Sequence, residues 1–403
     1  MTRMLRDTLE NWAGEVRVPH DMADRALRRR VRWTPVMASA LALGLVAALT
    51  LVVSDLGGPE LTVRPASGVT LPARPSPAPT DVRADTENSP PARLVAAGRM
   101  AVSAYYTTHQ EKIAEDRSQL RRTWSLYEPS TGGYESTSFA WVDVAPGLQV
   151  AAVVQGELMG RRLGIMDMNT REYLKWFDLE HSVASVAWSP DGTKILATAY
   201  SSYPDVLDGV SAPDGTSGHR VDQASPSRTS PRTGYYIVDV EAGTADFHPL
   251  PADDADNRFN ARQDFGWSLD GSLIWAPLVV EPGKVFYTLD GRKHAAPEGE
   301  RYVWGTGHSA TSPDGRLLLG PDGMPTKITN VATGEVAGQQ NVLRLQAWAD
   351  DDNVLALGCA GQCENEYNNG LVLVSVDGRR LTQLTPYRNT QDDGTWHWVL
   401  TPR

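Results

Sequence analysis

The chain has 403 residues, which is enough for a large folded core with appended segments. Hydrophobic residues make up 41% and charged residues 22%, as in folded proteins, and the net charge of −11 excludes nucleic acid as the main partner. The charge is uneven along the chain. Residues 1–35 contain eight Arg and five acidic residues, a net charge of +3, so the remaining residues together carry −14.

Residues 1–34 are predicted to form an amphipathic cytoplasmic tail. Four apolar residues are spaced by four, three and four positions, which places them on one face of a helix: Leu5, Leu9, Trp12 and Val16. Two interpretations stay open. The tail lies against anionic lipid at the inner leaflet, which the spacing favours, or it docks on a cytoplasmic regulator such as a transcription factor.

Residues 35–54 are predicted to form a transmembrane helix, so the lipid bilayer is an expected partner. The run PVMASALALGLVAALTLVV has no charge over 19 residues, and a helix of this length spans roughly 28 Å. Five arginines directly precede the run and no basic residue follows until Arg64, so the N-terminus is predicted to be cytoplasmic and the C-terminal part extracytoplasmic. A cleaved signal peptide is the weaker alternative, because the run is long and no small-x-small site follows it.

Residues 55–92 are predicted to be a disordered, extended linker. They contain eight Pro among 38 residues and few large apolar residues after Val69. Such a segment can hold the following domain away from the membrane.

From residue 93 to residue 403 the sequence changes to short apolar runs that alternate with turn signals. A strand–turn–strand unit recurs as VAWSPDGTKILATAY (186–200), FGWSLDGSLIWAPLV (265–279), SATSPDGRLLLG (309–320), LQAWADDDNVLALG (345–358) and FAWVDVAPGLQVAAVV (139–154). Aspartates begin the tight turns, prolines preset the turn dihedral and glycines supply a positive φ. The turn residues assigned a structural role are Pro190, Asp191, Gly192, Asp270, Gly271, Pro313, Asp314 and Gly315.

A second hairpin follows several of these units, so each unit is predicted to be a four-stranded sheet. The copies are about 37 to 80 residues apart, a spacing typical of propeller blades. The best count is six blades, with seven as the alternative. The C-terminal stretch 395–400 is predicted to be a lone first strand that completes the blade begun by residues 93–134 and closes the ring.

The W-S-P-D-G turn resembles that of WD-repeat-like β-propellers of the TolB type, over about three quarters of the chain. The copies at 139 and 345 depart from it, since the first lacks the Asp-Gly pair and the second has three aspartates. The resemblance implies an all-β propeller and says little about function. Arg outnumbers Lys by 32 to 6, a usage similar to that of GC-rich, actinobacterial-like genomes.

Several features have both a functional and a structural interpretation. Cys359 and Cys363, the only cysteines, are predicted to form a disulfide, given an extracytoplasmic location. The stretch 200–233, rich in Ser, Pro and Gly, is either a mobile surface loop, which is slightly favoured, or a partner-binding lid. The aspartate clusters at 253–256 and 350–352 match no calcium loop, and the histidines lack metal-ligand spacing, so no metal, cofactor or catalytic residue is assigned. Trp188, Trp267 and Trp348 are predicted to be core residues, and Trp396 and Trp398 are expected at the closure.

The favoured function is a membrane-anchored extracytoplasmic binding or sensing module whose propeller face recognises a protein or an envelope component. The layout is similar to that of bacterial transmembrane regulators of sigma factors, although the zinc-binding anti-sigma motif is missing, so signalling to a cytoplasmic sigma factor is one hypothesis. A propeller enzyme of the lactonase or glycan-cleaving type and a structural envelope scaffold are the alternatives. A catalytic role is less favoured than a non-catalytic one.

Overall fold

The computed structural model describes residues 69–71, 78–115, 117–208, 230–250, 262–278, 283–297, 300, 308–321, 323–361, 365–392 and 394–403. The predicted tail, the predicted membrane helix of residues 35–54 and most of the linker lie outside them. No helix within the described ranges is long and apolar enough to cross a bilayer. The chain divides into two compact units, Met1–Thr62 and Val63–Arg403, and everything below concerns the second.

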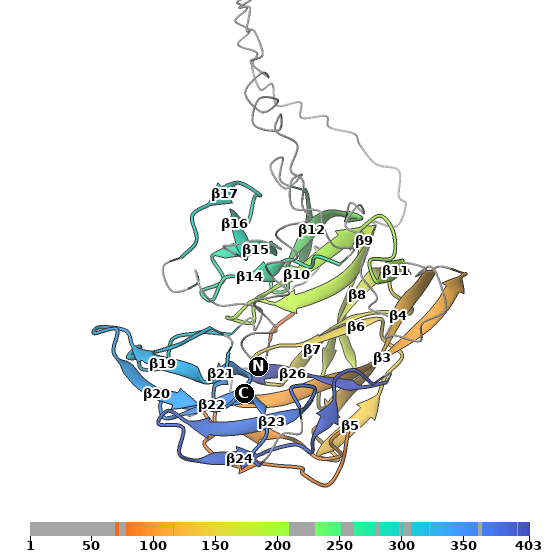
Figure 1. The fold of residues 1–403 in the computed structure, drawn as a ribbon. Helices are drawn as coiled ribbons and strands as arrows, with labels where there is room; N and C mark the ends of the chain where they lie inside the picture. The colour runs from red at the N-terminus through yellow and green to blue at the C-terminus, as the bar shows by residue number, and fades with distance from the viewer. Residues whose placement is uncertain are drawn as a thin grey trace, which may run out of the picture. The chain divides into compact units, whose positions relative to one another are not determined.

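The described residues form antiparallel sheets, so the prediction of an all-β domain is confirmed (Figure 1). The first sheet joins the two ends of the domain. Its main strands are β26 (Trp396–Pro402), β3 (Met100–Ala114), β4 (Arg117–Glu128) and β5 (Gly133–Ser136). Three short strands extend it, namely β1 (Val82–Arg83), β2 (Ala96–Ala97) and β11 (Val206–Asp208).

The second sheet has seven strands and consists of two four-stranded sets that share one strand. The first set is β6 (Trp141–Val144), β7 (Val150–Val154), β8 (Gly160–Asp167) and β9 (Tyr173–Trp188). The second set is the end of β9 with β10 (Lys194–Tyr200), β12 (Arg232–Asp239) and β13 (Thr244–Pro249). The 16 residues of β9 pair first with β8 and then, from Val183 onward, with β10.

Three smaller sheets follow in chain order. The third contains β14 (Gly266–Trp267), β15 (Leu273–Pro277), β16 (Lys284–Thr288) and β17 (Lys293–His294). The fourth contains β18 (Leu317–Leu319), β19 (Thr326–Asn330) and β20 (Val336–Gln340), with a single bridge from Thr311 to Leu318. The fifth contains β21 (Arg344–Trp348), β22 (Asn353–Gly358), β23 (Asn368–Ser375), β24 (Leu381–Gln383) and β25 (Arg388–Asn389).

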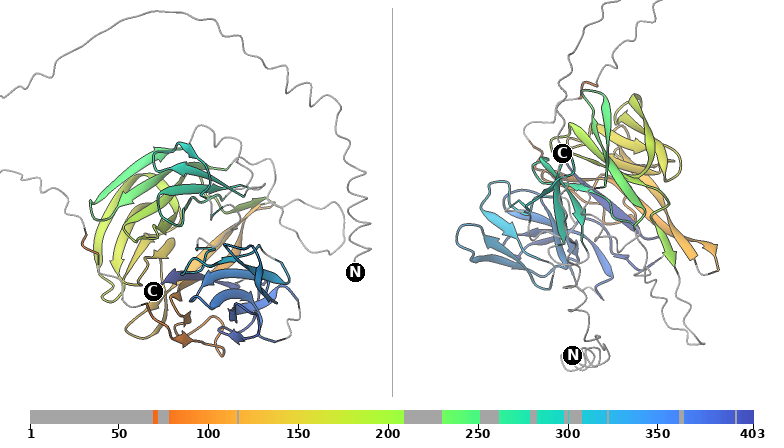
Figure 2. Two further views of the ribbon diagram at one scale, coloured as in Figure 1. Left: turned by 90° about the vertical axis from the view of Figure 1, so that its left-hand side faces the viewer. Right: turned by 90° about the horizontal axis from the view of Figure 1, so that it is seen from above.

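The sheets follow one another around a common centre (Figure 2, left). The last strand, β26, pairs with β3 from Trp396 opposite Thr107 to Pro402 opposite Met100. This pairing occupies the edge that β3 would otherwise expose, which is the physical reason for placing a lone strand at the end of the chain.

Apolar side chains fill the space between consecutive sheets. One buried cluster joins the first sheet to the β6–β9 set, a second joins that set to the β9–β13 set, and a third joins the latter to the β14–β17 sheet. Two further clusters join the fourth sheet to the fifth and the fifth to the first. Stability therefore depends on face-to-face contact between neighbouring sheets, because each buries one face of the next.

Three tryptophans link neighbouring sheets by a repeated hydrogen bond. Trp188, Trp267 and Trp348 are each at most 6% exposed, which confirms their prediction as core residues. Their indole Nε1 groups donate to the carbonyl oxygens of Asp143, Ala187 and Ala310 at 3.2, 2.9 and 2.9 Å. The acceptors for Trp267 and Trp348 belong to the preceding sheet, and the acceptor for Trp188 belongs to the first four-stranded set of its own sheet. Each indole therefore both packs and donates a hydrogen bond across an interface.

A serine–aspartate pair stabilises the tight turns. In the turn before β15, Ser268 Oγ donates to Asp270 Oδ1 at 2.7 Å and accepts from the Leu273 amide at 2.9 Å. Gly271, which follows the aspartate, has a φ of +72°, a conformation that glycine adopts without steric cost. The same serine bonds recur at Ser189–Asp191, Ser312–Asp314 and Ser375–Asp377.

The end of the linker differs from its prediction. Asp85 is 1% exposed, and its Oδ2 accepts the amides of Ala92 and Arg93 at 2.7 and 3.0 Å. Ser89 Oγ accepts the indole of Trp396 at 3.0 Å. Residues 78–92 are thus packed on the domain rather than extended away from it, because a buried carboxylate organises their turns and β1 pairs with β2.

Candidate binding site

A short segment of the predicted loop 200–233 crosses from the second sheet to the first. Residues 201–208, here called the strap, follow β10, and β11 at their end pairs with residues 117–119 of β4. The carbonyl oxygen of Asp205 accepts the Leu120 amide at 3.0 Å, and Tyr203 donates its hydroxyl to the Leu120 carbonyl at 3.0 Å. The strap is therefore docked on the long β3–β4 hairpin (Figure 1), whereas residues 209–229 lie outside the described part of the chain.

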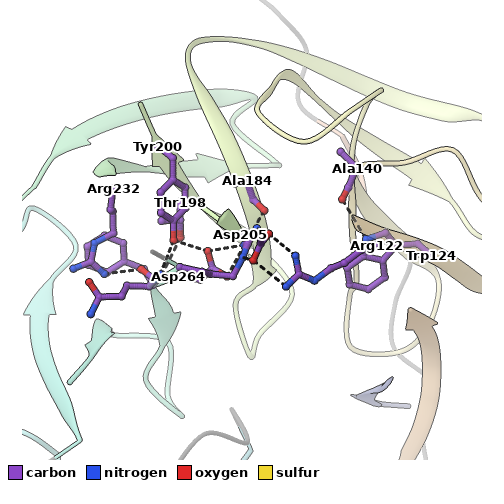
Figure 3. A network of polar contacts seen from close by, with 12 residues as sticks. Arg122, Trp124, Ala140, Ala184, Thr198, Tyr200, Asp205, Arg232 and Asp264 are labelled. Atoms are coloured by element: carbon purple, nitrogen blue, oxygen red, sulfur yellow. Dashed lines mark hydrogen bonds and ion pairs between the residues drawn. The ribbon is translucent and has the colours of Figure 1, made fainter. Parts of the chain in front are cut away.

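The Asp205 carboxylate lies between two guanidinium groups (Figure 3). Arg122 of β4 donates to its two oxygens at 2.5 and 3.1 Å. Arg262, which precedes β14, donates to them at 2.7 and 2.6 Å. The Asp205 side chain is 4% exposed, so three segments distant in sequence meet at one buried charge.

Arg262 extends the network further. Its Nη1 donates to both oxygens of Asp264, at 3.1 and 2.9 Å, and to the Ala184 carbonyl at 3.1 Å. Tyr200 donates its hydroxyl to Asp264 at 2.8 Å and accepts the Gln263 amide at 3.0 Å. Two guanidiniums and two carboxylates balance one another, so this part of the network is neutral overall.

The surroundings shift the ionisation of these groups. Burial alone raises the pKa of Asp205, but hydrogen bonds and charge from Arg262 and Arg122 outweigh it and hold the pKa below its ordinary value. Burial lowers the pKa of Arg262, yet the charges of Asp264 and Asp205 leave it raised. Burial and the adjacent Asp264 raise the pKa of Tyr200 well above its ordinary value. Asp205 and Arg262 are therefore ionised near neutral pH.

Aromatic rings lie against the guanidinium groups. Arg122 and Arg262 lie over the Trp141 ring, with Cζ at 5.3 and 4.6 Å from its centroid. Arg122 is also 5.6 Å from the Tyr106 ring, which stacks on His397 at 5.0 Å. Each cation is thus held against the electron-rich face of an aromatic ring.

Arg388 extends this cation–aromatic series beside β26. Its Cζ lies 4.4 Å from the Trp398 ring centroid and 5.5 Å from that of Trp396. Its Nε and Nη1 are buried without a hydrogen-bond acceptor, and no carboxylate pairs with it among the described residues. Burial lowers the pKa of Arg388 to about 10. Burial, with Arg388 and Arg122 nearby, lowers the pKa of His397 to about 4, which indicates an electropositive environment around β26.

A pocket of about 160 Å³ lies beside this network. Its wall includes Arg121, Arg122, Phe139, Leu158 and, from the strap, Tyr203. It combines apolar surface from Phe139 and Leu158 with the charged edge of β4. Arg122 therefore contacts both the pocket and the Asp205 network.

The residues singled out in the sequence do not assemble at this site. The turn residues Asp191, Asp270 and Asp314 lie in separate hairpins, each bonded to the serine two positions earlier. Leu5, Leu9, Trp12 and Val16, and the aspartates at 253–256, lie outside the described residues. Sequence reasoning missed Arg122, Asp205, Arg262 and Arg388. The nearest signal was the lid interpretation of the loop that contains Asp205.

The structure describes one of the two cysteines. Cys359 is 4% exposed and has no free thiol. Cys363 lies outside the described residues, so the pairing of the two stays a prediction.

Comparisons with known proteins give no information on function. No model of a known family and no curated protein matches the chain. Among solved structures, the β-propeller domain of Myceliophteria thermophila Cps50 (Swd1) is 11% identical with a TM-score of 0.34, and the match covers 74% of this chain and 88% of that one. TolB from Acinetobacter baumannii is 17% identical with a TM-score of 0.36, and the match covers 75% of this chain and 68% of that one. Kuenenia stuttgartiensis hydrazine synthase is 13% identical with a TM-score of 0.31, and the match covers 62% of this chain and 68% of that one. At these scores the similarities carry no argument about function.

Proposed function

We propose that the domain is a non-catalytic binding module that recognises an anionic group of its partner at Arg388. The observation that carries the proposal is a half-buried guanidinium that lies over two indole rings. Its Nε and Nη1 are buried without an acceptor, and no carboxylate pairs with it among the described residues. An arginine in this setting is matched to a carboxylate, sulfate or phosphate, because its planar donors bind such groups with defined geometry.

The energetics favour a binding role over a structural one for Arg388. Burying a charge without a partner is unfavourable, and contact with the two indoles offsets only about 0.5–2 kcal/mol of that cost. If the side chain at this position served packing alone, an apolar residue of similar length would give a more stable protein. Retention of a destabilising charge is typical of a site at which a ligand supplies the missing partner.

We expect Arg388→Met to raise the unfolding free energy of the ligand-free protein by about 1 kcal/mol, because it removes a half-buried charge that has no carboxylate partner among the described residues. The same variant is expected to lose stabilisation by small anions. Thermal unfolding of the full-length protein in detergent micelles, with sodium acetate, phosphate or sulfate replacing chloride at constant ionic strength, measures both effects. Anions that bind the native state raise the melting temperature by mass action.

Arg292→Met is the matched control, since Arg292 has an exposed side chain whose one carboxylate partner in the described part of the chain is the exposed Asp290. Non-specific salt effects are common to wild type and both variants, so the informative quantity is the extra shift seen in wild type and Arg292→Met alone. Equal anion shifts in all three proteins, or a clearly destabilised Arg388→Met, would show that Arg388 has a structural role and would refute the proposal.

We further propose that the domain is held outside the membrane by the segment 35–54 and that the tail 1–34 contacts a cytoplasmic regulator such as a sigma factor. The uninterrupted apolar run and the preceding arginines support the anchor, and the apolar face of the tail supports the contact. A pull-down with the full-length protein and purified sigma factors tests the tail. Specific capture that is lost in the Leu9→Asp, Trp12→Asp variant is expected, and absence of capture would leave the tail as an anchor flank only.

We also propose six blades. The support is the division of the second sheet at β9 and the five clusters that join consecutive sheets. Seven remains the alternative count.

A further inference from the structure

The pocket beside the strap lies at a break in the hydrogen-bond ladder of β4. On one side of the break, β11 pairs with β4 as far as Gln119, and the carbonyl oxygen of Asp205 then accepts the Leu120 amide. On the other side, β5 pairs with β4 from Ser125 onward, and the amide of Thr137 donates to the Trp124 carbonyl at 2.8 Å. Residues 121–123 lie between these two partners, and all three line the pocket.

The peptide groups of Arg122 face into this break. In an antiparallel pair the N–H and C=O of successive residues point alternately to the two sides of a strand. Those of Leu120 and Trp124 point toward the strap and β5, so those of Arg122 point the same way. The pairing of the neighbouring strand β3 supports this orientation. Thr108 of β3 lies opposite Arg122, and its amide and carbonyl bond to the residues directly before β26 rather than to β4.

No described residue bonds to the amide or the carbonyl of Arg122. An unpaired N–H and C=O on one strand residue form the template to which an extended chain adds by main-chain hydrogen bonds. The strap bonds to both peptide groups of Leu120, and Thr137 bonds to the Trp124 carbonyl, so the free edge between them is short. A short free edge flanked by strands on both sides is matched to a short segment rather than a long one.

The remainder of the pocket suits a side chain. Its volume of about 160 Å³ is over ten times the ~10–15 Å³ that one water requires. The half-buried rings of Phe139 and Tyr203 and the side chain of Leu158 supply apolar surface, while Ser138 lies exposed at the rim. A ligand that both completes the β4 ladder and contacts these groups needs an amide backbone with an apolar substituent.

We propose that this pocket binds a short extended peptide, whose backbone pairs with Arg122 and whose apolar side chain contacts Phe139, Leu158 and Tyr203. The peptide then bridges the strap and β5, so its binding also favours the docked strap, since Tyr203 belongs to both. The site is separate from the anion site proposed at Arg388 and does not depend on it.

The test uses blocked tetrapeptides, acetyl-Thr-Xaa-Val-Thr-amide with Leu, Phe or Tyr as Xaa, labelled for fluorescence anisotropy against the full-length protein in micelles. At least one is expected to bind saturably and to slow hydrogen exchange at residues 120–124. Methylating the Xaa nitrogen removes one ladder hydrogen bond, so it should weaken binding about five- to tenfold, the equivalent of about 1–1.4 kcal/mol. Ser138→Trp should abolish binding by filling the rim.

Ser136→Trp is the control, because Ser136 is also exposed, lies two residues earlier and is outside the pocket lining. It and Arg388→Met are expected to leave peptide binding unchanged, which separates this inference from the proposed anion site. The inference is overturned if no peptide slows exchange at residues 120–124, or if N-methylation and Ser138→Trp leave the affinity unchanged.

Discussion

Replacing Asp205 by Ala is expected to destabilise the domain by about 3–5 kcal/mol, because it leaves the Arg122 and Arg262 guanidiniums buried without their shared carboxylate. That loss is a large share of the roughly 5–15 kcal/mol that stabilises a typical domain. It should be seen as a lower urea midpoint. Hydrogen exchange at residues 117–120 should also speed up, because the strap is no longer held against β4.

Two further variants identify the cause of that loss. Asp290→Ala removes an exposed partner of Arg292 and is expected to change stability by at most about 1 kcal/mol. Adding Arg122→Met to Asp205→Ala should recover part of the lost stability, because Asp205 is the one carboxylate that pairs with Arg122 among the described residues, whereas Arg262 keeps Asp264. An Asp205→Ala protein as stable as the Asp290→Ala control would contradict the importance of the network.

The same carboxylate predicts the acid sensitivity of the domain. Because the pKa of Asp205 is lowered on folding, its contribution to stability is complete above the ordinary carboxyl pKa of about 3.9 and is lost as the pH falls through the lowered value. The unfolding free energy of an Asp205→Asn variant should therefore fall less steeply below pH 4 than that of the wild type.

The second large effect concerns the indole that joins the second sheet to the third. Trp267→Ala is expected to lower the unfolding free energy by about 3–5 kcal/mol, because it opens a cavity between two sheets and removes the hydrogen bond to the Ala187 carbonyl. Trp267→Phe keeps most of the ring and loses the Nε1 donor, so a cost of about 1–3 kcal/mol is expected, including the unpaired carbonyl. Urea unfolding of both variants measures the difference. Equal costs would show that the hydrogen bond matters more than the packing.

Local patterns in the sequence predicted the main hairpins, although not β1 or the packed turns of residues 78–92. The hairpin around Asp270 and Gly271 was predictable because a turn depends on the dihedral preferences and side-chain bonds of four or five consecutive residues. Period-two alternation located the strands, and the lone apolar strand before the C-terminus indicated a partner elsewhere, which is β3. These features follow from interactions within or between neighbouring segments.

Only the tertiary structure decided the candidate site. Arg122 and Asp205 are 83 residues apart, and Asp205 and Arg262 are 57 apart, so no spacing rule relates them. The absence of a carboxylate partner for Arg388 among the described residues, and the break in the β4 ladder at Arg122, are likewise properties of what lies nearby in space. The sequence determined which residues form strands, because that choice is local. The packing of the sheets decided which charges meet and which are left for a ligand, because electrostatic and hydrogen-bond partners depend on distances between segments that are remote along the chain.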